Sequence, residues 1–153
     1  MTRGDLVIVD TNILLSATNR DRADHEASYR VFAKAMEMGL HLATCGQVLR
    51  EYLVVATRPV AVNGLGLSLE DSLENLEWFR KRQVYLEETE SVHHILVKLL
   101  KSHQVTSKNI HGMNIVAVMR QNSVRAILTN NVADFSGITE IEILGPTTLV
   151  DME

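Results

Sequence analysis

The sequence predicts an α/β protein with a central, mostly parallel sheet that carries helices on both faces. Short and wholly apolar runs, such as residues 6–9, are typical of strands that are buried on both faces, as in parallel sheets. Segments with apolar residues at three- and four-residue steps separate these runs and indicate helices. Strands that alternate with helices in this way favour a parallel sheet between helical layers. The 153 residues are enough for one domain with its own core.

Five strands are expected from the short apolar runs. They lie at 6–9, 40–43, 84–86, 124–128 and 141–144. Right-handed crossovers would bring the carboxyl ends of all of them to one edge of the sheet, where ligands bind in folds of this class. The residues that follow the strands are therefore the first place to search for chemistry.

Five helices are expected from apolar periodicity and from helix-end signals. They cover 24–38, 46–57, 68–82, 89–103 and 112–122. Gly39 stops the first of these helices, and Pro59 ends the second. Ser68 begins the third, with Asp71 three residues on, as in a capping box. The stretch 59–67, which contains two glycines, is expected to be a loop.

Composition excludes several classes of protein. The longest apolar runs have about five residues, far fewer than the roughly 18 that a membrane span needs. Only four apolar residues precede Asp10, so no signal peptide is expected. The single Cys45 cannot form an internal disulfide, which favours a cytoplasmic protein with a small, buried, unreactive thiol. The net charge of −4 disfavours a coat for duplex nucleic acid, but an enzyme that binds nucleic acid through a local basic rim and a metal remains open.

Asp10 is the first acidic candidate. It follows the strand at 6–9, and Thr11 and Asn12 beside it can hold its carboxylate in place. A simpler role, in which Asp10 only caps the turn that follows, explains the residue equally well.

Glu51 is the second acidic candidate. Helical spacing places it beside the apolar residues Val48 and Tyr52, and acids rarely lie there without a partner or a metal. An ion pair with Arg50 or Arg58 at the edge of the helix is the alternative.

A third polar cluster follows the strand at 124–128. It contains Thr129, Asn131 and Asp134. An ordinary turn rich in Asn and Asp explains this cluster almost as well as a site does. The convergence of three segments on one sheet edge is a stronger signal than any one of them, because a bound cation takes oxygens from separate segments.

Four segments together resemble the PIN-domain ribonucleases, especially the VapC-type toxins of bacterial toxin–antitoxin pairs. These segments are Val-Asp-Thr-Asn-Ile-Leu (9–14), Val-Leu-Arg-Glu-Tyr-Leu (48–53), Leu-Thr-Asn-Asn-Val-Ala-Asp-Phe (128–135) and Ile-Leu-Gly-Pro (143–146). They occur in the order and at the spacing of the family over nearly the whole chain. The resemblance implies a single PIN-like domain over 1–153, built as a three-layer α/β/α sandwich.

The resemblance also implies a metal-dependent endoribonuclease. In that family a carboxylate cluster binds Mg²⁺ or Mn²⁺, which activates water for attack on an RNA phosphodiester. The catalytic residues implied are Asp10, Glu51, Asn131 and Asp134. The three acids would bind the metal directly or through water, while Asn12 and Thr129 would orient them. A cognate antitoxin that places an Arg or an apolar helix near the acidic pocket, and a homodimer, are implied as well.

One position departs from the family pattern. The third acidic segment of the family usually has Asp where this chain has Gly112, in Asn-Ile-His-Gly-Met-Asn (109–114). Loss of that carboxylate is expected to weaken metal binding or rate, by analogy with changes around metal sites that cost about 10–100-fold. Asn114 is not expected to substitute, because it points about 200° further round the helix. His111 is a poor replacement, because Mg²⁺ favours oxygen ligands.

Two functions from different classes therefore remain open. The first is an active metal-dependent ribonuclease and toxin. The second is a PIN-fold module that binds RNA or a protein, with catalysis weakened or lost through Gly112. A phosphatase with Asp10 as its nucleophile is disfavoured, because such enzymes commonly have a second Asp where this chain has Asn12.

Overall fold

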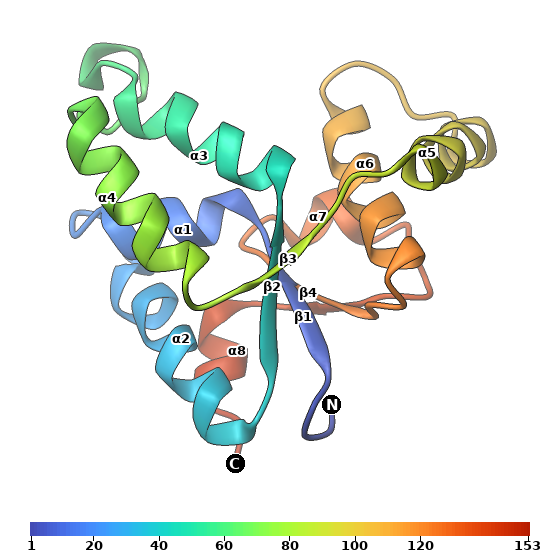
Figure 1. The fold of residues 1–153 in the computed structure, drawn as a ribbon, viewed down its shortest axis with the longest axis horizontal. Coiled ribbons are helices and arrows are strands. Elements are labelled where there is room, and N and C mark those ends of the chain that lie inside the picture. Colours follow the sequence, from blue (N-terminus) through green and yellow to red (C-terminus); the bar gives the residue numbers. More distant parts are fainter.

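The computed structural model describes all of residues 1–153 and contains one wholly parallel sheet (Figure 1). The strands are β1 (Leu6–Val9), β2 (His41–Cys45), β3 (Val84–Leu86), β4 (Ala126–Leu128) and β5 (Glu142–Leu144). Their order in the sheet is β3-β2-β1-β4-β5, and each neighbouring pair is parallel. The predicted parallel sheet is confirmed, with β1 at its centre.

Eight α-helices and one short 3₁₀ helix surround the sheet. They are α1 (Thr11–Thr18), α2 (His25–Met38), α3 (Gly46–Thr57), η1 (Val60–Val62), α4 (Leu69–Arg80), α5 (Glu90–His103), α6 (Asn109–Gln121), α7 (Val132–Phe135) and α8 (Pro146–Val150). Figure 1 shows α1 to α4 and α8 on one side of the sheet, and α5 to α7 on the other. The predicted three-layer α/β/α architecture is confirmed.

Three short α-helices are absent from the prediction: α1, α7 and α8. The stretch 59–67, predicted as a loop, contains the single-turn 3₁₀ helix η1. Most of the eight residues of α1 are buried, so it lacks the alternation of apolar and polar faces that reveals a longer helix. The other two have only four and five residues, too few for a period to appear. The helix predicted at 112–122 begins earlier, at Asn109, and the strand predicted at 124–128 begins later, at Ala126. No helix has both the length and the apolar character that crossing a membrane requires.

The register of the central strands positions the residues that follow them. Val9 pairs with Leu128, and the Asp10 amide donates to the Leu128 carbonyl at 2.9 Å. Asp10 and Thr129, which come next in the two strands, are therefore neighbours at the carboxyl edge of the sheet. The three strand residues before Asp10 are fully buried, so the backbone that carries Asp10 is held by the core.

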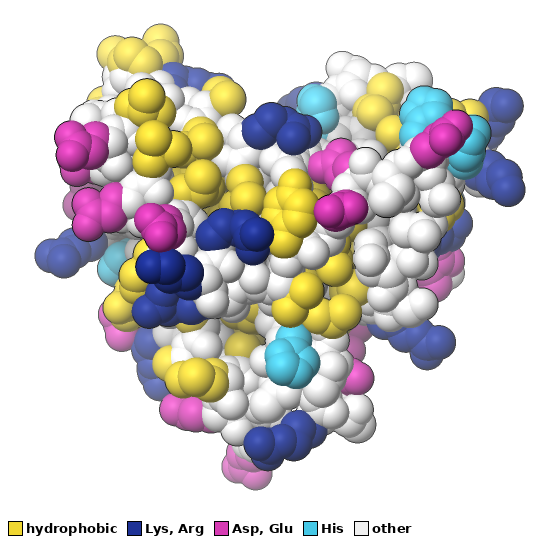
Figure 2. Space-filling view, viewed as in Figure 1, with side chains coloured by type: hydrophobic (Ala, Val, Ile, Leu, Met, Phe, Trp, Pro, Cys, Tyr) yellow, Lys and Arg dark blue, Asp and Glu magenta, His cyan; other side chains and the backbone are white.

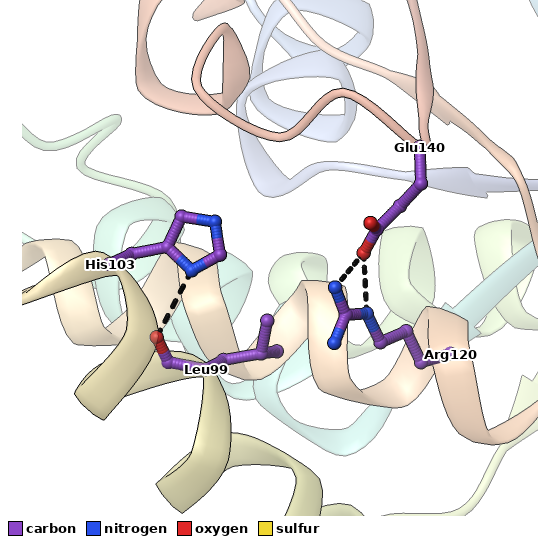
Figure 3. A network of polar contacts seen from close by, with 4 residues as sticks. All are labelled: Leu99, His103, Arg120 and Glu140. Carbon is purple, nitrogen blue, oxygen red and sulfur yellow. Dashed lines mark hydrogen bonds and ion pairs between the residues drawn. The ribbon is translucent and has the colours of Figure 1, made fainter.

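Figure 3 shows polar contacts near the C-terminal ends of the neighbouring helices α5 and α6. Arg120 pairs with Glu140, which precedes β5, and both side chains are exposed. An exposed pair of this kind contributes at most about 1 kcal/mol to stability. In the neighbouring α5, His103 Nδ1 lies 3.1 Å from the Leu99 carbonyl oxygen and closes the last turn.

Candidate active site at the carboxyl edge of the sheet

Asp10 is a buried carboxylate held by three hydrogen bonds. Its Oδ1 accepts from the Thr11 amide at 2.8 Å, and its Oδ2 accepts from the Thr129 hydroxyl at 2.7 Å and from the Asn12 amide at 3.1 Å. The residue is only 8% exposed. Burial raises the pKa of the Asp10 carboxyl, the Thr129 and Thr11 hydrogen bonds oppose that rise, and the charge of Glu51 adds to it. Asp10 is also the N-cap of α1. The cap of a following turn and a place in the polar site, which the sequence offered as alternatives, therefore occur together.

The loop after β4 is tied to Asp10 through Asn12 and Thr129. The side-chain NH₂ group of Asn12 also donates to the Thr129 hydroxyl oxygen at 3.2 Å. The side-chain oxygen of Asn12 accepts from the backbone amide of Asn130 at 3.0 Å. Thr129 Oγ1 accepts from the Asn131 backbone amide at 3.0 Å. These contacts fix the first residues of the loop relative to the Asp10 carboxylate.

Glu51 lies beside Asp10, on α3. Its Oε2 accepts from the Thr11 hydroxyl at 3.0 Å, and its Oε1 accepts from the Gln47 amide at 2.9 Å. The side chain is half-buried, and no ion pair joins it to Arg50 or Arg58. Glu51 is therefore held beside Asp10 by neutral hydrogen-bond donors, and its negative charge has no ion-pair partner within the chain.

The structure does not join Asp134 to these two acids. Asp134 is exposed on the four-residue α7, and no shared hydrogen-bond donor links its carboxylate to Asp10 or Glu51, which are themselves linked through Thr11. The Asn131 side chain also makes no hydrogen bond, although its backbone amide reaches Thr129. No group of three or more acidic, His or Cys side chains lies together in a way that could hold a metal ion. Of the three predicted acids, Asp10 and Glu51 are joined by hydrogen bonds through Thr11, and the part of Asp134 stays a prediction.

Gln47, Glu88 and Asn114 belong to the same polar network and were not predicted as site residues. The Asn114 amide donates to Gln47 Oε1 at 2.7 Å and to Glu88 Oε2 at 3.1 Å, although Asn114 contacts neither Asp10 nor Glu51. Glu88 Oε1 accepts from the Gln47 backbone amide at 2.8 Å. Glu88 follows the short strand β3 by two residues, so the rule that residues after parallel strands gather at one edge could have identified it.

Gly112 faces Phe135. A Cβ atom at this position would lie 3.7 Å from two ring carbons of Phe135, which is an ordinary van der Waals contact. The residue is half-buried in the first turns of α6, and its φ is not in the left-handed region. The fold therefore has room for a side chain here, and nothing in the backbone demands glycine.

The donors present fit a hydrated divalent cation. Mg²⁺ keeps several waters in proteins and is commonly bound through one or two carboxylates together with substrate phosphates. Asp10 and Glu51 supply two such groups, and a buried carboxylate without a cationic partner is costly unless something neutralises it. A cavity of about 300 Å³ lies against Glu51, between α3 and the α5–α6 pair, and Gln47, Arg50, His111 and Asn114 contribute to its lining.

Cys45 is a fully buried residue at the end of β2, as predicted. Burial raises the pKa of its thiol to about 11, so the thiol stays protonated at neutral pH. We expect modification of Cys45 by a thiol reagent at pH 8 to be at least about 100-fold slower in native protein than in urea-unfolded protein. Equal rates in the two states would show that the β2 end is open to solvent.

Comparisons with known proteins agree with this architecture. Residues 6–133 match the PIN domain family model. VapBC2 from Rickettsia felis, solved with a DNA fragment from its promoter, is 17% identical, with a TM-score of 0.67 over 92% of this chain and 98% of that chain. VapBC-1 from nontypeable Haemophilus influenzae is 18% identical, with a TM-score of 0.66 over 93% and 98%.

A third structure has a comparable likeness. VapC20 from Mycobacterium tuberculosis, described as a toxin that cleaves the sarcin–ricin loop, is 17% identical, with a TM-score of 0.67 over 89% of this chain and 97% of that chain. No curated protein matches the sequence. The structural likenesses establish the fold, while the sequence match covers most of the chain, from β1 to the first residues of α7. The chain therefore belongs to the PIN-domain family.

Proposed function

We propose that the protein is an endoribonuclease that depends on Mg²⁺ or Mn²⁺, and that it is the toxin of a type II toxin–antitoxin pair. Nuclease activity is the function that membership of the PIN-domain family supports. The observation that carries the proposal is the joined pair of carboxylates. Asp10 is buried without a cationic partner. Thr11 joins the two acids, because its backbone amide donates to Asp10 and its hydroxyl donates to Glu51.

The residues of the pair have separate tasks. Asp10 and Glu51 hold the cation, and a cation bound there supplies Lewis-acid activation of water and of the scissile phosphate. Asn12 and Thr129 fix the Asp10 carboxylate through hydrogen bonds to the oxygen that faces the loop after β4. Neutral donors suit this task because they orient the carboxylate without cancelling the charge that attracts the metal.

Asp134 and Asn131 remain in the proposal as residues that act through water. No shared hydrogen-bond donor links the Asp134 carboxylate to the other two acids, which favours a contact through water over a direct one. Asn131 lies in the loop that Thr129 ties to Asp10, and Asp134 follows it on α7, so a water-mediated contact is the role consistent with their position.

Cleavage of a defined single strand tests the proposal. Labelled single-stranded RNA is incubated with purified protein and Mn²⁺, and DNA of the same sequence serves as the matched substrate. We expect cleavage of the RNA, its loss on addition of EDTA, and little cleavage of the DNA. Cutting that persists in EDTA would contradict a metal-dependent site.

A binding module without catalysis is the second candidate. Gly112 and the exposed position of Asp134 favour it, because only two of the acids expected for the metal, Asp10 and Glu51, are joined to each other by hydrogen bonds. Such a module would bind the same labelled RNA in a mobility-shift assay and release it intact in the presence of Mn²⁺. Cleavage by the wild-type chain would contradict this candidate.

An antitoxin is the proposed partner of the toxin. The face between α2 and α4 is the proposed docking place, because a cavity of about 580 Å³ there combines the aromatic rings of Tyr29, Trp78 and Phe79 with charged and polar residues such as Arg20, His25 and Glu26, which fits an amphipathic helix. The Tyr29 ring, half exposed, stacks on Trp78 with centroids 5.8 Å apart. We place the pair in the cytoplasm, the compartment of the RNA substrate. Growth of a bacterial host that is unaffected by expression of the chain would contradict a toxin.

A homodimer is the proposed assembly. Figure 2 shows hydrophobic side chains gathered over α3 and α4, at the upper left of the view. The exposed apolar residues of these elements and of the connection between them are Val54, Val60, Val62, Leu69 and Leu73. Apolar groups gathered on one face commonly mark a protein interface. Light scattering that gives the mass of one chain at micromolar concentration would contradict the dimer.

A further inference from the structure

Gln47 connects Glu51 to the first turn of α6. Its side-chain amide donates one hydrogen bond to Glu51 Oε1 at 2.9 Å and a second to the His111 carbonyl at 2.9 Å. The His111 carbonyl belongs to the residue before Gly112, the position where the family has its third acid. One side chain therefore contacts both the acid on α3 and the backbone next to the altered position on α6.

The orientation of the Gln47 amide is fixed by its neighbours. An amide can be turned by 180° with little change in shape, so its hydrogen-bond partners must decide which end carries the donors. The Glu88 carboxylate can only accept, so the Asn114 amide must direct its NH₂ group at Glu88 Oε2, at 3.1 Å, and the same NH₂ group donates to Gln47 Oε1 at 2.7 Å. With its oxygen held in this way, Gln47 must present its NH₂ group to Glu51.

Burial makes this arrangement costly to disturb. Gln47 is only 6% exposed, and both hydrogens and the oxygen of its side-chain amide have partners. Removal of one partner of a buried polar group leaves the other without a hydrogen bond and without water to replace it. Glu88 also accepts from the Gln47 backbone amide at 2.8 Å, which anchors the residue at the start of α3.

The network accounts for the orientation of Glu51. Glu51 has one oxygen on Thr11, beside Asp10, and the other on Gln47. Without the Gln47 contact, one Glu51 oxygen would lose its only protein partner, and the side chain could turn toward the adjacent cavity of about 300 Å³. A carboxylate that rotates between positions binds a cation less tightly than one that is held in place.

We propose that Gln47 is a positioning residue. It holds the Glu51 carboxylate and the first turn of α6 in one fixed arrangement and thereby sets the affinity of the site for a divalent cation, an inference that rests on the metal-dependent function proposed above. Asn114 acts one step further out, by fixing the orientation of the Gln47 amide.

Mn²⁺ affinity of the full, metal-free chain, measured by calorimetry, tests this role independently of catalysis. Gln47→Met replaces the amide with an apolar side chain of similar length, and we expect it to weaken Mn²⁺ binding about 10–100-fold. Asn114→Ala is expected to weaken binding by a smaller factor, about threefold, because Gln47 keeps its contact with Glu51. Asn122→Ala is the matched control: it removes a half-buried amide at the other end of α6, and the only hydrogen bond of that side chain is to the Val118 carbonyl.

The outcomes separate this inference from the proposed function. Mn²⁺ binding by folded Gln47→Met within twofold of wild type would overturn the role of Gln47. If Gln47→Met does not fold, Asn114→Ala decides, and an affinity equal to that of Asn122→Ala would overturn the inference. Wild-type protein that binds no Mn²⁺ would overturn the proposed function and this inference together. If Asp10→Asn lost binding while both network variants kept it, only the inference would fail.

Discussion

Replacement of Asp10 by Asn is expected to reduce Mn²⁺-dependent RNA cleavage to less than about one hundredth of the wild-type rate. Asn keeps the size of the side chain and an acceptor for the Thr11 amide, so the cap of α1 survives. The substitution removes the charge that attracts the cation, and loss of a direct ligand should cost more than the about 10–100-fold typical of changes around the ligands. Steady-state cleavage of labelled RNA measures the effect.

The same substitution is expected to stabilise the metal-free protein near neutral pH. Burial raises the pKa of Asp10 above its ordinary value of 3.8, so the folded chain holds the Asp10 proton more tightly than the unfolded chain does. The stability associated with this proton is present below pH 3.8 and is lost as the pH rises through the folded-state pKa. Asp10→Asn avoids that loss, so its Tm should exceed that of wild type at pH 7 and approach it in acid.

Asp5 provides the matched control at the other end of β1. It is exposed, and the Thr2 backbone amide that donates to it lowers the pKa of its carboxyl, the opposite direction to Asp10. Asp5→Asn is expected to leave cleavage unchanged. Mn²⁺ should raise the Tm of wild type and of Asp5→Asn, but not that of Asp10→Asn, because only a ligand that binds the folded state stabilises it. An equal Mn²⁺-dependent shift in all three proteins would place the metal elsewhere.

Gly112→Asp is expected to raise Mn²⁺ affinity and RNA cleavage by about 10–100-fold. The fold accepts a side chain at this position, because the nearest atoms to its Cβ would be Phe135 ring carbons at 3.7 Å. An Asp in the first turns of α6 also interacts favourably with the helix dipole and recovers a few tenths of a kcal/mol of the cost of glycine in a helix. Calorimetric titration with Mn²⁺ and cleavage of labelled RNA measure the two effects.

Two variants separate the charge from the other effects of the change. Gly112→Ala restores helix propensity alone, and Gly112→Asn adds a side chain of the same shape without the charge. Both should raise Tm or leave it unchanged, with no gain in metal affinity. An inert Gly112→Asp protein would count against the view that this position belongs to the metal site. Equal gains in Asp and Asn variants would mean that shape or helix stability, and not charge, was missing.

Much of the fold could be predicted from local patterns. The helix 46–57 was predicted with its observed bounds, because Pro59 ends it and its apolar period is regular. Ser68 was recognised as a helix start, and in the structure its hydroxyl accepts from the Asp71 amide at 3.0 Å. The helix α1 was missed, because a helix buried on nearly every side carries no periodic signal.

The candidate site could be predicted only in part. Asp10 can be identified because it follows a strand, and Glu51 because it interrupts the apolar face of a helix. Both positions are visible in the sequence. Gln47 gives no comparable signal, since an uncharged amide near the start of a helix is ordinary, and its role depends on Asn114, 67 residues further on. Asp134 satisfied the same strand-end rule as Asp10, yet the short α7 turns it to solvent, which only tertiary structure decides.

The central claim is that Asp10 and Glu51 form the core of a metal-dependent ribonuclease site. Its most direct test is the rate of RNA cleavage by wild-type and Asp10→Asn proteins, prepared in parallel and titrated with Mn²⁺. The account predicts cleavage by wild type that rises with Mn²⁺ and saturates, and less than about one hundredth of that rate by the variant at any concentration. Equal cleavage by both proteins, or none by either at saturating Mn²⁺, would contradict it.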